Sequence, residues 1–381
     1  MFDSENPSPE QLLEATDLKR KRAETKSLDV SLNELADMYE ANELKIRPEF
    51  QRLFRWSESK QSQFIESLLL EMPIPAVFII EIEEGKWELI DGLQRLSTFL
   101  HYRGQLEAPD LDPPIRKGDK LALTGCDILE ELNGTSYDDL PLALQIRLKR
   151  SFLRVEAIRQ DTDPHFRYYM FKRLNTGGEL LSEQEVRNCT IRLLDEKFNA
   201  FLIELSRNDD FKTCISSLTE DRRRMMGDVE LVLRFFAFKN NFSEFRYDVR
   251  AFLTDYMERV SDNSNENHIK FNYPKERLEF GKIFKVLAVT LGENTCIRCL
   301  EDDRYGGQFL IHHFEALSLG VAKVADRIND SDFPWADIKD KLADVKKDPE
   351  FRELITGGGQ NSPGPYKKKI DFVSEKLRSL L

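Results

Sequence analysis

The residues best suited to chemistry in this chain form the segment Asp91-Gly92-Leu93-Gln94-Arg95. A short apolar run ends at Asp91 and a helical pattern follows, so the free N–H groups at the helix start would point outward and attract an anion. Gly92 has no Cβ and would let the backbone approach a ligand closely. Arg95 can donate to phosphate oxygens, Gln94 can orient a water or bond a phosphate or sugar oxygen, and Asp91 can hold a metal ion, a ribose hydroxyl or a water. The alternative is an ordinary Asp-Gly turn with a solvated Arg95.

A second group of candidate binding residues precedes this segment. It consists of Arg47, Gln51, Arg52, Trp56 and Lys60. Closely spaced cations beside an aromatic ring suit a polyphosphate with a stacked base or sugar. A charged, solvated surface next to an amphipathic helix is the alternative interpretation.

A third group surrounds a predicted loop rich in glycine. It contains Arg173, Asn175, Thr176, Gly177 and Gly178, with Glu185 and Asn188 on the next helix. A helix end followed by a Gly-Gly loop and a capped helix start is similar to a phosphate-cradling loop that lacks the P-loop lysine. A plain helix-to-helix turn explains the same pattern.

Sequence periodicity predicts the elements that would hold these residues in the first half of the chain. Apolar residues at helical spacing predict helices over 27–39, opening at Ser31, over 57–72, capped by Ser57, and over 93–102. Residues 77–83 and 87–90 predict a β-hairpin, and 152–159 a strand. A short helix is expected over 141–150. Ser182 and Glu185 have the spacing of a capping box that opens a further helix.

Beyond residue 205 the pattern is almost wholly helical, with helices expected over 229–238, 247–260, 275–291, 308–328 and 366–381. Strand-like alternation is absent there. The sequence therefore predicts an α+β chain with a flexible leader over 1–26, a domain of strands and helices over 27–204, and a helical domain over 205–381.

Composition limits the choice of partners. The net charge of -12 and pI near 5.2 do not indicate a strong, sequence-independent grip on DNA. Five cysteines at irregular spacing fit a reducing cytoplasm better than a disulfide framework. The polar N-terminus and the short apolar runs predict neither a secretory signal nor a membrane span, so a cytoplasmic protein without a membrane partner is expected.

Together, these groups resemble one family, the N-terminal domain of GmrSD-type restriction enzymes. The resemblance runs from about Ser27 to Cys189 and rests on a set of short motifs, which are Arg47-Pro48-Glu49-Phe50-Gln51-Arg52, Trp56, Ser67-Leu68, Pro73-Ile74-Pro75, Asp91 to Thr98, Leu132-Asn133-Gly134, Asp139-Leu140-Pro141, Arg173 to Gly178 and Leu181 to Asn188. It implies a ParB/sulfiredoxin-like fold and an Asp-Gly-Gln-Gln-Arg nucleotide site tied to NTP hydrolysis. It also implies a role in bacterial or archaeal defence against phage and modified DNA.

The chain departs from this family in two places. Leu93 stands where the family usually has Gln, so one side-chain amide is missing and turnover is in question. In the restriction enzymes an HNH-type nuclease domain follows, but none is recognisable here among the five histidines. His312-His313 lies in a predicted helix without a β-hairpin before it. Cys296 and Cys299 are interpreted as ordinary cysteines rather than zinc ligands.

The leading hypothesis is therefore a nucleotide-binding, NTP-hydrolysing regulatory module that uses a nucleoside triphosphate with Mg²⁺. Arg95, Arg52 and the helix start would hold the phosphates, with Arg173 and Asn175 closing over the nucleotide. Asp91 would position Mg²⁺ or the attacking water, and Gln94 would orient that water. The hypothesis requires that Arg95 is not held in an internal ion pair and that apolar side chains do not fill the site.

Two other functions remain open. One is a DNA nuclease of ParB-like fold, which the acidic composition disfavours. The other is a non-catalytic nucleotide sensor or scaffold whose helical half docks a separate nuclease protein.

Overall fold

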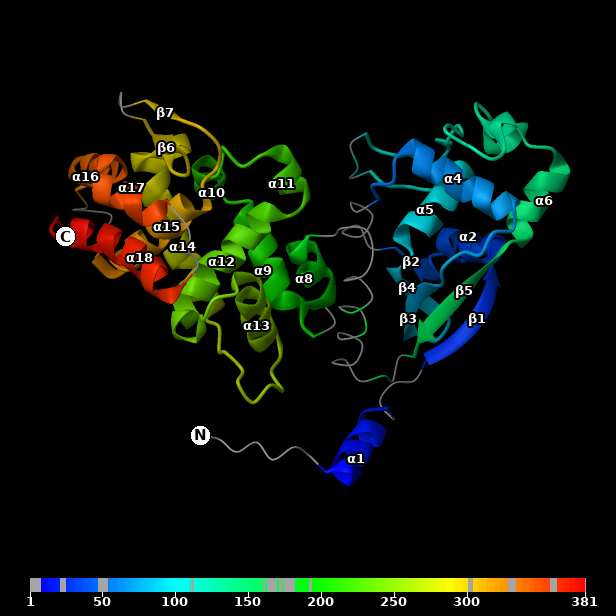
Figure 1. Ribbon diagram of the computed structural model, residues 1–381, viewed down its shortest axis with the longest axis horizontal. Coiled ribbons are helices and arrows are strands. Elements are labelled where there is room, and N and C mark those ends of the chain that lie inside the picture. The colour runs from blue at the N-terminus through cyan, green and yellow to red at the C-terminus, as the bar shows by residue number, and fades with distance from the viewer. Residues whose placement is uncertain are drawn as a thin grey trace. The chain divides into compact units, whose positions relative to one another are not determined.

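The computed structural model describes residues 8–20, 25–46, 54–109, 111, 113–159, 162, 170, 173, 182–191, 194–300, 304–327, 334–356 and 362–380. The chain divides into two compact units, Met1–Glu179 and Leu180–Leu381 (Figure 1). Sequence periodicity had placed this division between 204 and 205. Helices α8 (Glu183–Ile191) and α9 (Glu196–Ser206) pack with the helices of the second unit.

The first unit is built on a five-stranded mixed sheet in the order β1-β5-β3-β4-β2. Its strands are β1 (Thr25–Ser31), β2 (Leu44–Lys45), β3 (Val77–Glu83), β4 (Lys86–Asp91) and β5 (Phe152–Ile158). Strands β3 and β4 form the predicted antiparallel hairpin, whereas β3 runs parallel to β5. On β5, Leu153, Val155 and Ala157 are buried, which confirms the predicted alternation along this strand.

The helices of this unit are α1 (Pro9–Arg20), α2 (Leu32–Glu40), α4 (Glu58–Leu69), α5 (Leu93–Tyr102) and α6 (Leu142–Arg150), with short 3₁₀ turns at Glu130–Leu132 and Tyr137–Asp139. Helices α2, α4, α5 and α6 pack on one another over the sheet (Figure 1). Ile79, Ile80, Leu96, Phe99 and Leu100 are among the side chains that form the core between these layers. Burial of this apolar area is the main term that holds α5 against the sheet.

Two predictions about the N-terminal region need correction. Residues 27–30 belong to strand β1, which pairs antiparallel with β5, and only the second part of the expected helix forms. Ser31 does cap that helix, because its hydroxyl accepts a hydrogen bond from the Glu34 N–H at 3.1 Å. The predicted leader contains the exposed helix α1 and the start of β1 at Thr25.

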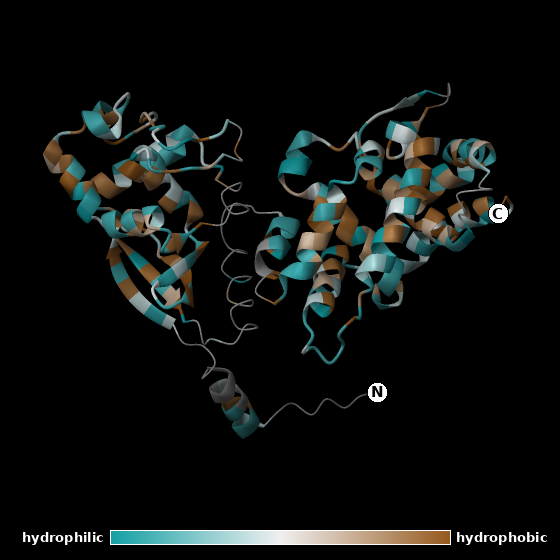
Figure 2. Cartoon of the chain, turned by 180° about the vertical axis from the view of Figure 1, so that it is seen from behind, coloured by the Kyte–Doolittle hydropathy of each residue, from teal (hydrophilic) through white to brown (hydrophobic). Residues whose placement is uncertain are grey.

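The second unit is a helical bundle, as the sequence predicts. Beyond α8 and α9 its helices are α10 (Asp209–Cys214), α11 (Glu220–Arg224), α12 (Gly227–Asn241), α13 (Val249–Ser261), α14 (Tyr273–Thr290), α15 (Ile311–Ala322), α16 (Trp335–Lys347), α17 (Pro349–Ile355) and α18 (Pro363–Arg378), with short 3₁₀ turns at Phe242–Glu244, Gly292–Asn294 and Ala325–Arg327. Figure 2 shows apolar bands on these helices, separated by polar ones. Phenylalanine rings in mutual contact, mostly edge-to-face or tilted, fill the centre, among them Phe235, Phe280, Phe284 and Phe314.

One short hairpin interrupts the helices. β6 (Arg298–Cys299) pairs antiparallel with β7 (Tyr305–Gly306), directly before α15. Each strand has two residues, too few for alternation to be visible in the sequence. In the described part of the chain, no helix is both long and apolar enough to cross a membrane.

Candidate functional site

The predicted strand-to-helix junction is present. β4 ends at Asp91 and α5 begins at Leu93, with Gly92 between them in the left-handed region at φ 100° and ψ 14°. No side chain of the described residues caps the start of α5 by a hydrogen bond. Among the described side chains, none therefore competes with an anion for the positive end of the α5 dipole.

Gly92 is required by the packing of the junction as well as by its backbone angles. A Cβ at this position would lie 2.4 Å from Val77 Cγ1 on β3. Its φ of 100° is also a conformation that side chains of L-residues rarely adopt. The glycine that the sequence assigns to ligand approach thus has a structural reason of its own.

Arg95 is paired inside the site. One terminal guanidinium nitrogen lies 2.9 Å from Asp91 Oδ2. The Arg95 side chain is 14% exposed and the Asp91 side chain 37%. This corrects the expectation that Arg95 would be kept out of an internal ion pair. The contact joins two predicted site residues and uses a single nitrogen, so the pair is itself part of the candidate site.

Leu93 lies at the edge of the core. It is only 9% exposed and is followed in α5 by the buried Leu96. The side chain at the position where the family usually has Gln is thus mostly withdrawn from solvent. It contributes apolar packing to the first turn of α5 and no polar group.

Gln94 connects the junction to the segment around Trp56. Its Oε1 accepts hydrogen bonds from the backbone N–H groups of Arg55 and Trp56, at 3.0 and 3.1 Å. The prediction assigned Gln94 to a water or to the ligand, whereas this oxygen is occupied by the protein backbone. The bonds bring the second predicted group, through Trp56, next to the first.

Gln61 on α4 completes this arrangement, and sequence reasoning missed it. Its Nε2 donates to the Trp56 carbonyl at 2.9 Å, and its Oε1 lies 3.0 Å from His101 Nδ1. The Trp56 ring meets the ring of Phe64 edge-on, with centroids 5.7 Å apart. Burial lowers the pKa of His101, so the imidazole is neutral at pH 7 and can donate to Gln61. The signal in the sequence is the position of Gln61 on the apolar face of α4.

The structure places only some of the other predicted binding residues. Lys60 is exposed in the first turn of α4, where its N–H bonds the Ser57 cap at 3.3 Å. Arg173 is helical and exposed. The remaining residues of these two groups lie outside the described part of the chain, namely Arg47, Gln51, Arg52, Asn175, Thr176, Gly177 and Gly178.

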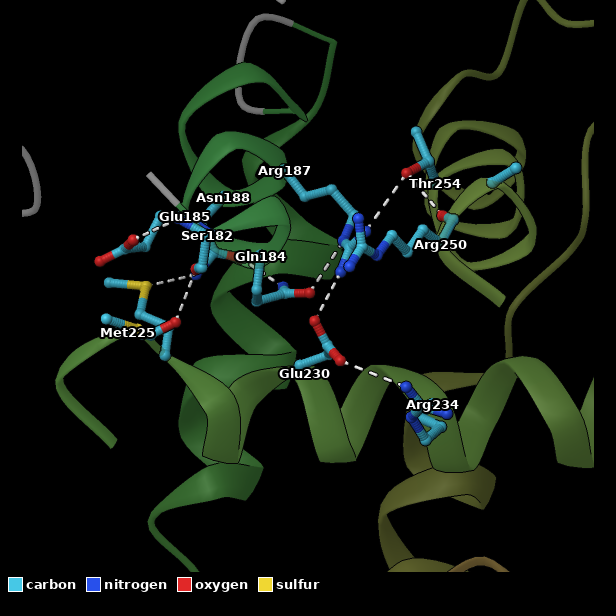
Figure 3. Close-up of polar contacts among 12 residues, drawn as sticks. Ser182, Gln184, Glu185, Arg187, Asn188, Met225, Glu230, Arg234, Arg250 and Thr254 are labelled. Atoms are coloured by element: carbon cyan, nitrogen blue, oxygen red, sulfur yellow. Dashed lines mark hydrogen bonds and ion pairs between the residues drawn. The ribbon is translucent and has the colours of Figure 1, made fainter. Parts of the chain in front are cut away.

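Helix α8, which follows the glycine-rich segment of the sequence, is anchored in the second unit (Figure 3). The predicted capping box at its start is confirmed, because Ser182 N–H donates to Glu185 Oε2 at 2.7 Å and Glu185 N–H to Ser182 Oγ at 3.2 Å. Asn188 is buried and accepts a hydrogen bond from Gln184 at 2.7 Å. Glu185 and Asn188 therefore stabilise α8 and its surroundings.

Arg187 is the polar residue of α8 that the sequence did not single out. It is 4% exposed and pairs with Glu230 on α12 at 2.9 Å, while also bonding Gln184 at 2.9 Å and Thr254 at 3.3 Å (Figure 3). A buried guanidinium needs such partners to offset its desolvation. Arg187 thus fixes α8 to α12 and α13.

The structure changes two expectations about the histidine and cysteine pairs. A hairpin, β6–β7, does precede His312-His313, and Cys299 lies on its first strand although the sequence shows no strand-like alternation there. Cys296 and Cys299 are both buried free thiols. Within the described ranges, no group of three or more His, Cys, Asp or Glu side chains is arranged to hold a metal ion.

One of three comparisons with known proteins finds a match. Residues 32–192 match the family described as GmrSD restriction endonuclease, N-terminal domain, so this region belongs to that family. The match begins with α2 and ends just after α8. Searches among curated proteins and solved structures find no match.

Proposed function

We propose that the GmrSD-type domain binds a nucleoside triphosphate with Mg²⁺ at the β4–α5 junction and hydrolyses it, as the regulatory module of a prokaryotic, cytoplasmic defence system. The observation that carries the proposal is the uncapped start of α5 beside the Asp91–Arg95 pair. An anion at this position would meet helix N–H groups and a guanidinium together. Phosphoryl transfer depends mainly on such positioning and charge stabilisation.

The Asp91–Arg95 pair is compatible with this role because it is weak. Partly exposed pairs four residues apart typically contribute about 0.2–1 kcal/mol. The Asp91 contact uses one terminal nitrogen, and the other N–H groups of the guanidinium can donate charge-assisted hydrogen bonds to phosphate oxygens. Phosphate oxygens can therefore compete with Asp91 for the guanidinium.

The residues at the junction fit a magnesium nucleotide by their chemistry. The Asp91 carboxylate is 37% exposed and is a hard oxygen donor of the kind that Mg²⁺ prefers. When bound, the ion would neutralise phosphate charge. Arg95 would hold a phosphate oxygen, and the α5 N–H groups would hold another.

We assign Gln94 a positioning role in place of the water-orienting role that the sequence suggested. Its two hydrogen bonds keep the backbone at Arg55 and Trp56 next to the junction. Arg47, Gln51 and Arg52, which precede Trp56 in the sequence, remain proposed phosphate contacts, and Arg173, Asn175, Thr176 and Gly177 remain proposed residues that close over the nucleotide.

A second candidate function is a nucleotide sensor that does not hydrolyse its ligand. The buried apolar Leu93 and the paired Arg95 favour it, since both reduce the polar groups ready for catalysis. In this case the helical unit would dock a separate nuclease protein. DNA is not a proposed primary ligand, given the net charge of -12.

Titration calorimetry of the purified chain with each of the four NTPs and Mg²⁺, together with phosphate release, tests the proposal. Saturable binding with phosphate release supports the hydrolase, and binding without release supports the sensor. Absence of binding to every NTP contradicts both. A plasmid-nicking assay under the same conditions tests the nuclease alternative.

A further inference from the structure

Two adjoining cavities lie in the second unit, where β6, α15, α16 and α17 meet. Their volumes are about 590 and 170 Å³, and both are lined by Arg298, His313, Ile355 and Thr356. Figure 1 shows β6, β7, α16 and α17 gathered at one end of this unit. We call the two together the α15 cavity. Small-molecule sites typically have about 300–1,000 Å³, so the α15 cavity has the size of a site for a nucleotide-sized ligand.

The lining of the α15 cavity is strongly cationic. Arg222, Arg298, Lys346 and Arg352 line it, and the described lining contains no Asp or Glu. This is unusual in a chain with 68 acidic and 56 basic residues. The three arginines form no ion pair with any other described residue. Their charges add up to a local positive potential that attracts an anion.

Lys346 places a buried ammonium group in the lining of the α15 cavity. Its side chain is only 1% exposed, and its ammonium donates to the Thr295 carbonyl at 3.1 Å and to the Asn294 carbonyl. No carboxylate of the described residues pairs with it. Burial lowers its pKa to about 8, so it is still mostly protonated at pH 7. A buried ammonium without a counter-charge is costly unless an anion approaches it.

His313 supplies a polar atom without a partner at the same place. The residue is 2% exposed, and its Nδ1 has no hydrogen-bond partner among the described residues. Burial, together with the charges of Lys346 and Arg298, lowers its pKa to about 3. The imidazole is thus neutral and can donate one N–H to a ligand oxygen.

The start of α15 adds backbone donors. Residues 309–313 line the smaller cavity, and Leu310 at the helix start offers no side-chain cap. The first turn of this 12-residue helix therefore presents N–H groups and the positive end of its dipole to the cavity. Arginines, a buried ammonium and a helix start together form the donor set expected for phosphate oxygens.

We propose that the α15 cavity binds the phosphate group of a small, nucleotide-sized ligand, at a site separate from the β4–α5 junction. The apolar lining by Leu300, Phe309 and Ile355 would cover the less polar part of that ligand. The helical unit is then a ligand-binding part of the chain in its own right.

Calorimetric titration of the full chain with inorganic pyrophosphate in EDTA tests this site without the magnesium that the junction is proposed to need. Saturable binding is expected for the native chain. Arg298→Glu should weaken it at least about ten-fold, because it removes one charge-assisted hydrogen bond and adds repulsion. Arg298 is exposed and unpaired with other described residues, so the variant should fold.

Two control variants separate this proposal from that for the junction. Arg207→Glu makes the same charge change at another exposed position of the second unit, and Arg95→Ala disables the junction. Arg207→Glu should bind pyrophosphate like the native chain, and Arg95→Ala should retain the binding that Arg298→Glu weakens. Absence of saturable binding to the native chain, or equal weakening by Arg298→Glu and Arg207→Glu, would overturn the proposal. A 5′-mononucleotide should displace pyrophosphate, and displacement only by a polynucleotide would rule out a small ligand.

Discussion

The side-chain oxygen of Gln94 lies 3.1 Å from the backbone nitrogen of Trp56 and accepts its hydrogen bond. The same oxygen accepts the Arg55 N–H at 3.0 Å, so one side chain of α5 holds two consecutive residues that are far away in the sequence. This contact joins the Asp91-to-Arg95 segment and the backbone at Arg55 and Trp56 in a single local structure. Its loss should affect both stability and ligand binding.

Gln94→Leu should lower the free energy of unfolding by about 1 kcal/mol, because two N–H donors lose their acceptor. NTP affinity should fall with it, since the Trp56 segment is no longer held. Gln94→Glu keeps an acceptor oxygen at nearly the same position and should retain most of the stability. Urea unfolding of both variants provides the measurement. Equal stability of Gln94→Leu and the native chain would show that the two hydrogen bonds to Gln94 do not stabilise the domain.

Gly92→Ala should destabilise the first unit more than Gly85→Ala does. Both glycines have positive φ, 100° and 74°, which costs a non-glycine residue about 1–2 kcal/mol. Only at Gly92 does the new Cβ meet Val77, at 2.4 Å, while nothing lies within 4 Å of it at Gly85. The overlap should add about 1–3 kcal/mol. Thermal melting of the two variants measures the difference. Adding Val77→Ala should partly restore the melting temperature of Gly92→Ala but not that of Gly85→Ala.

Glu315→Gln should be among the most destabilising single substitutions in the second unit. Glu315 is 1% exposed and bonds Lys369 at 2.5 Å and Arg234 at 2.7 Å. Removal of its charge leaves two buried cations with one partner fewer, which typically costs about 3–5 kcal/mol.

The exposed Glu83–Lys86 pair, 2.6 Å apart, provides the matched control. Glu83→Gln should leave the unfolding midpoint nearly unchanged, because solvent screens that pair. If Glu315→Gln has as small an effect as Glu83→Gln, the buried pairs do not stabilise the unit as described. Lys369→Met combined with Glu315→Leu should recover part of the loss.

His313 should make the second unit less stable as the pH falls below about 6.5. Burial lowers its pKa to about 3 in the folded protein, against about 6.5 in the unfolded chain. Between these two pKa values the unfolded chain binds more protons than the folded protein. The free energy of unfolding therefore rises with pH by up to about 1.4 kcal/mol per pH unit, and the contribution of His313 is complete above about pH 6.5. Urea unfolding of the native chain and His313→Phe at pH 5 and 7 isolates this contribution. The same pH dependence in both proteins would contradict it.

Local signals in the sequence predicted most of the elements that hold the junction. The alternation over 77–90 with Gly85 in the turn indicated the β3–β4 hairpin, and Gly92 marked the entry into α5. Ser57 and the Ser182–Glu185 pair marked helix starts, because capping depends on residues close in sequence.

The errors come from contacts between residues that are distant in sequence. Leu28 continues the apolar spacing of α2, yet Leu28 lies on β1, because it pairs with Val155 of β5. The Arg187–Glu230 pair and the Gln94–Trp56 bond likewise join separate elements. The Asp91–Arg95 pair is different, since a spacing of four residues is itself a signal for an ion pair.

Nucleotide binding at the β4–α5 junction requires the Asp91–Arg95 pair to open. The most direct measurement compares Mg²⁺–NTP binding and phosphate release among three proteins. The first is the Arg298→Glu variant, which lacks the proposed α15 cavity site but keeps the junction. The other two carry Asp91→Ala or Arg95→Ala in addition. We expect the first protein to bind and release phosphate, and both junction variants to lose these activities while their unfolding midpoints stay near that of the parent. Undiminished binding and turnover in both folded variants would contradict the account.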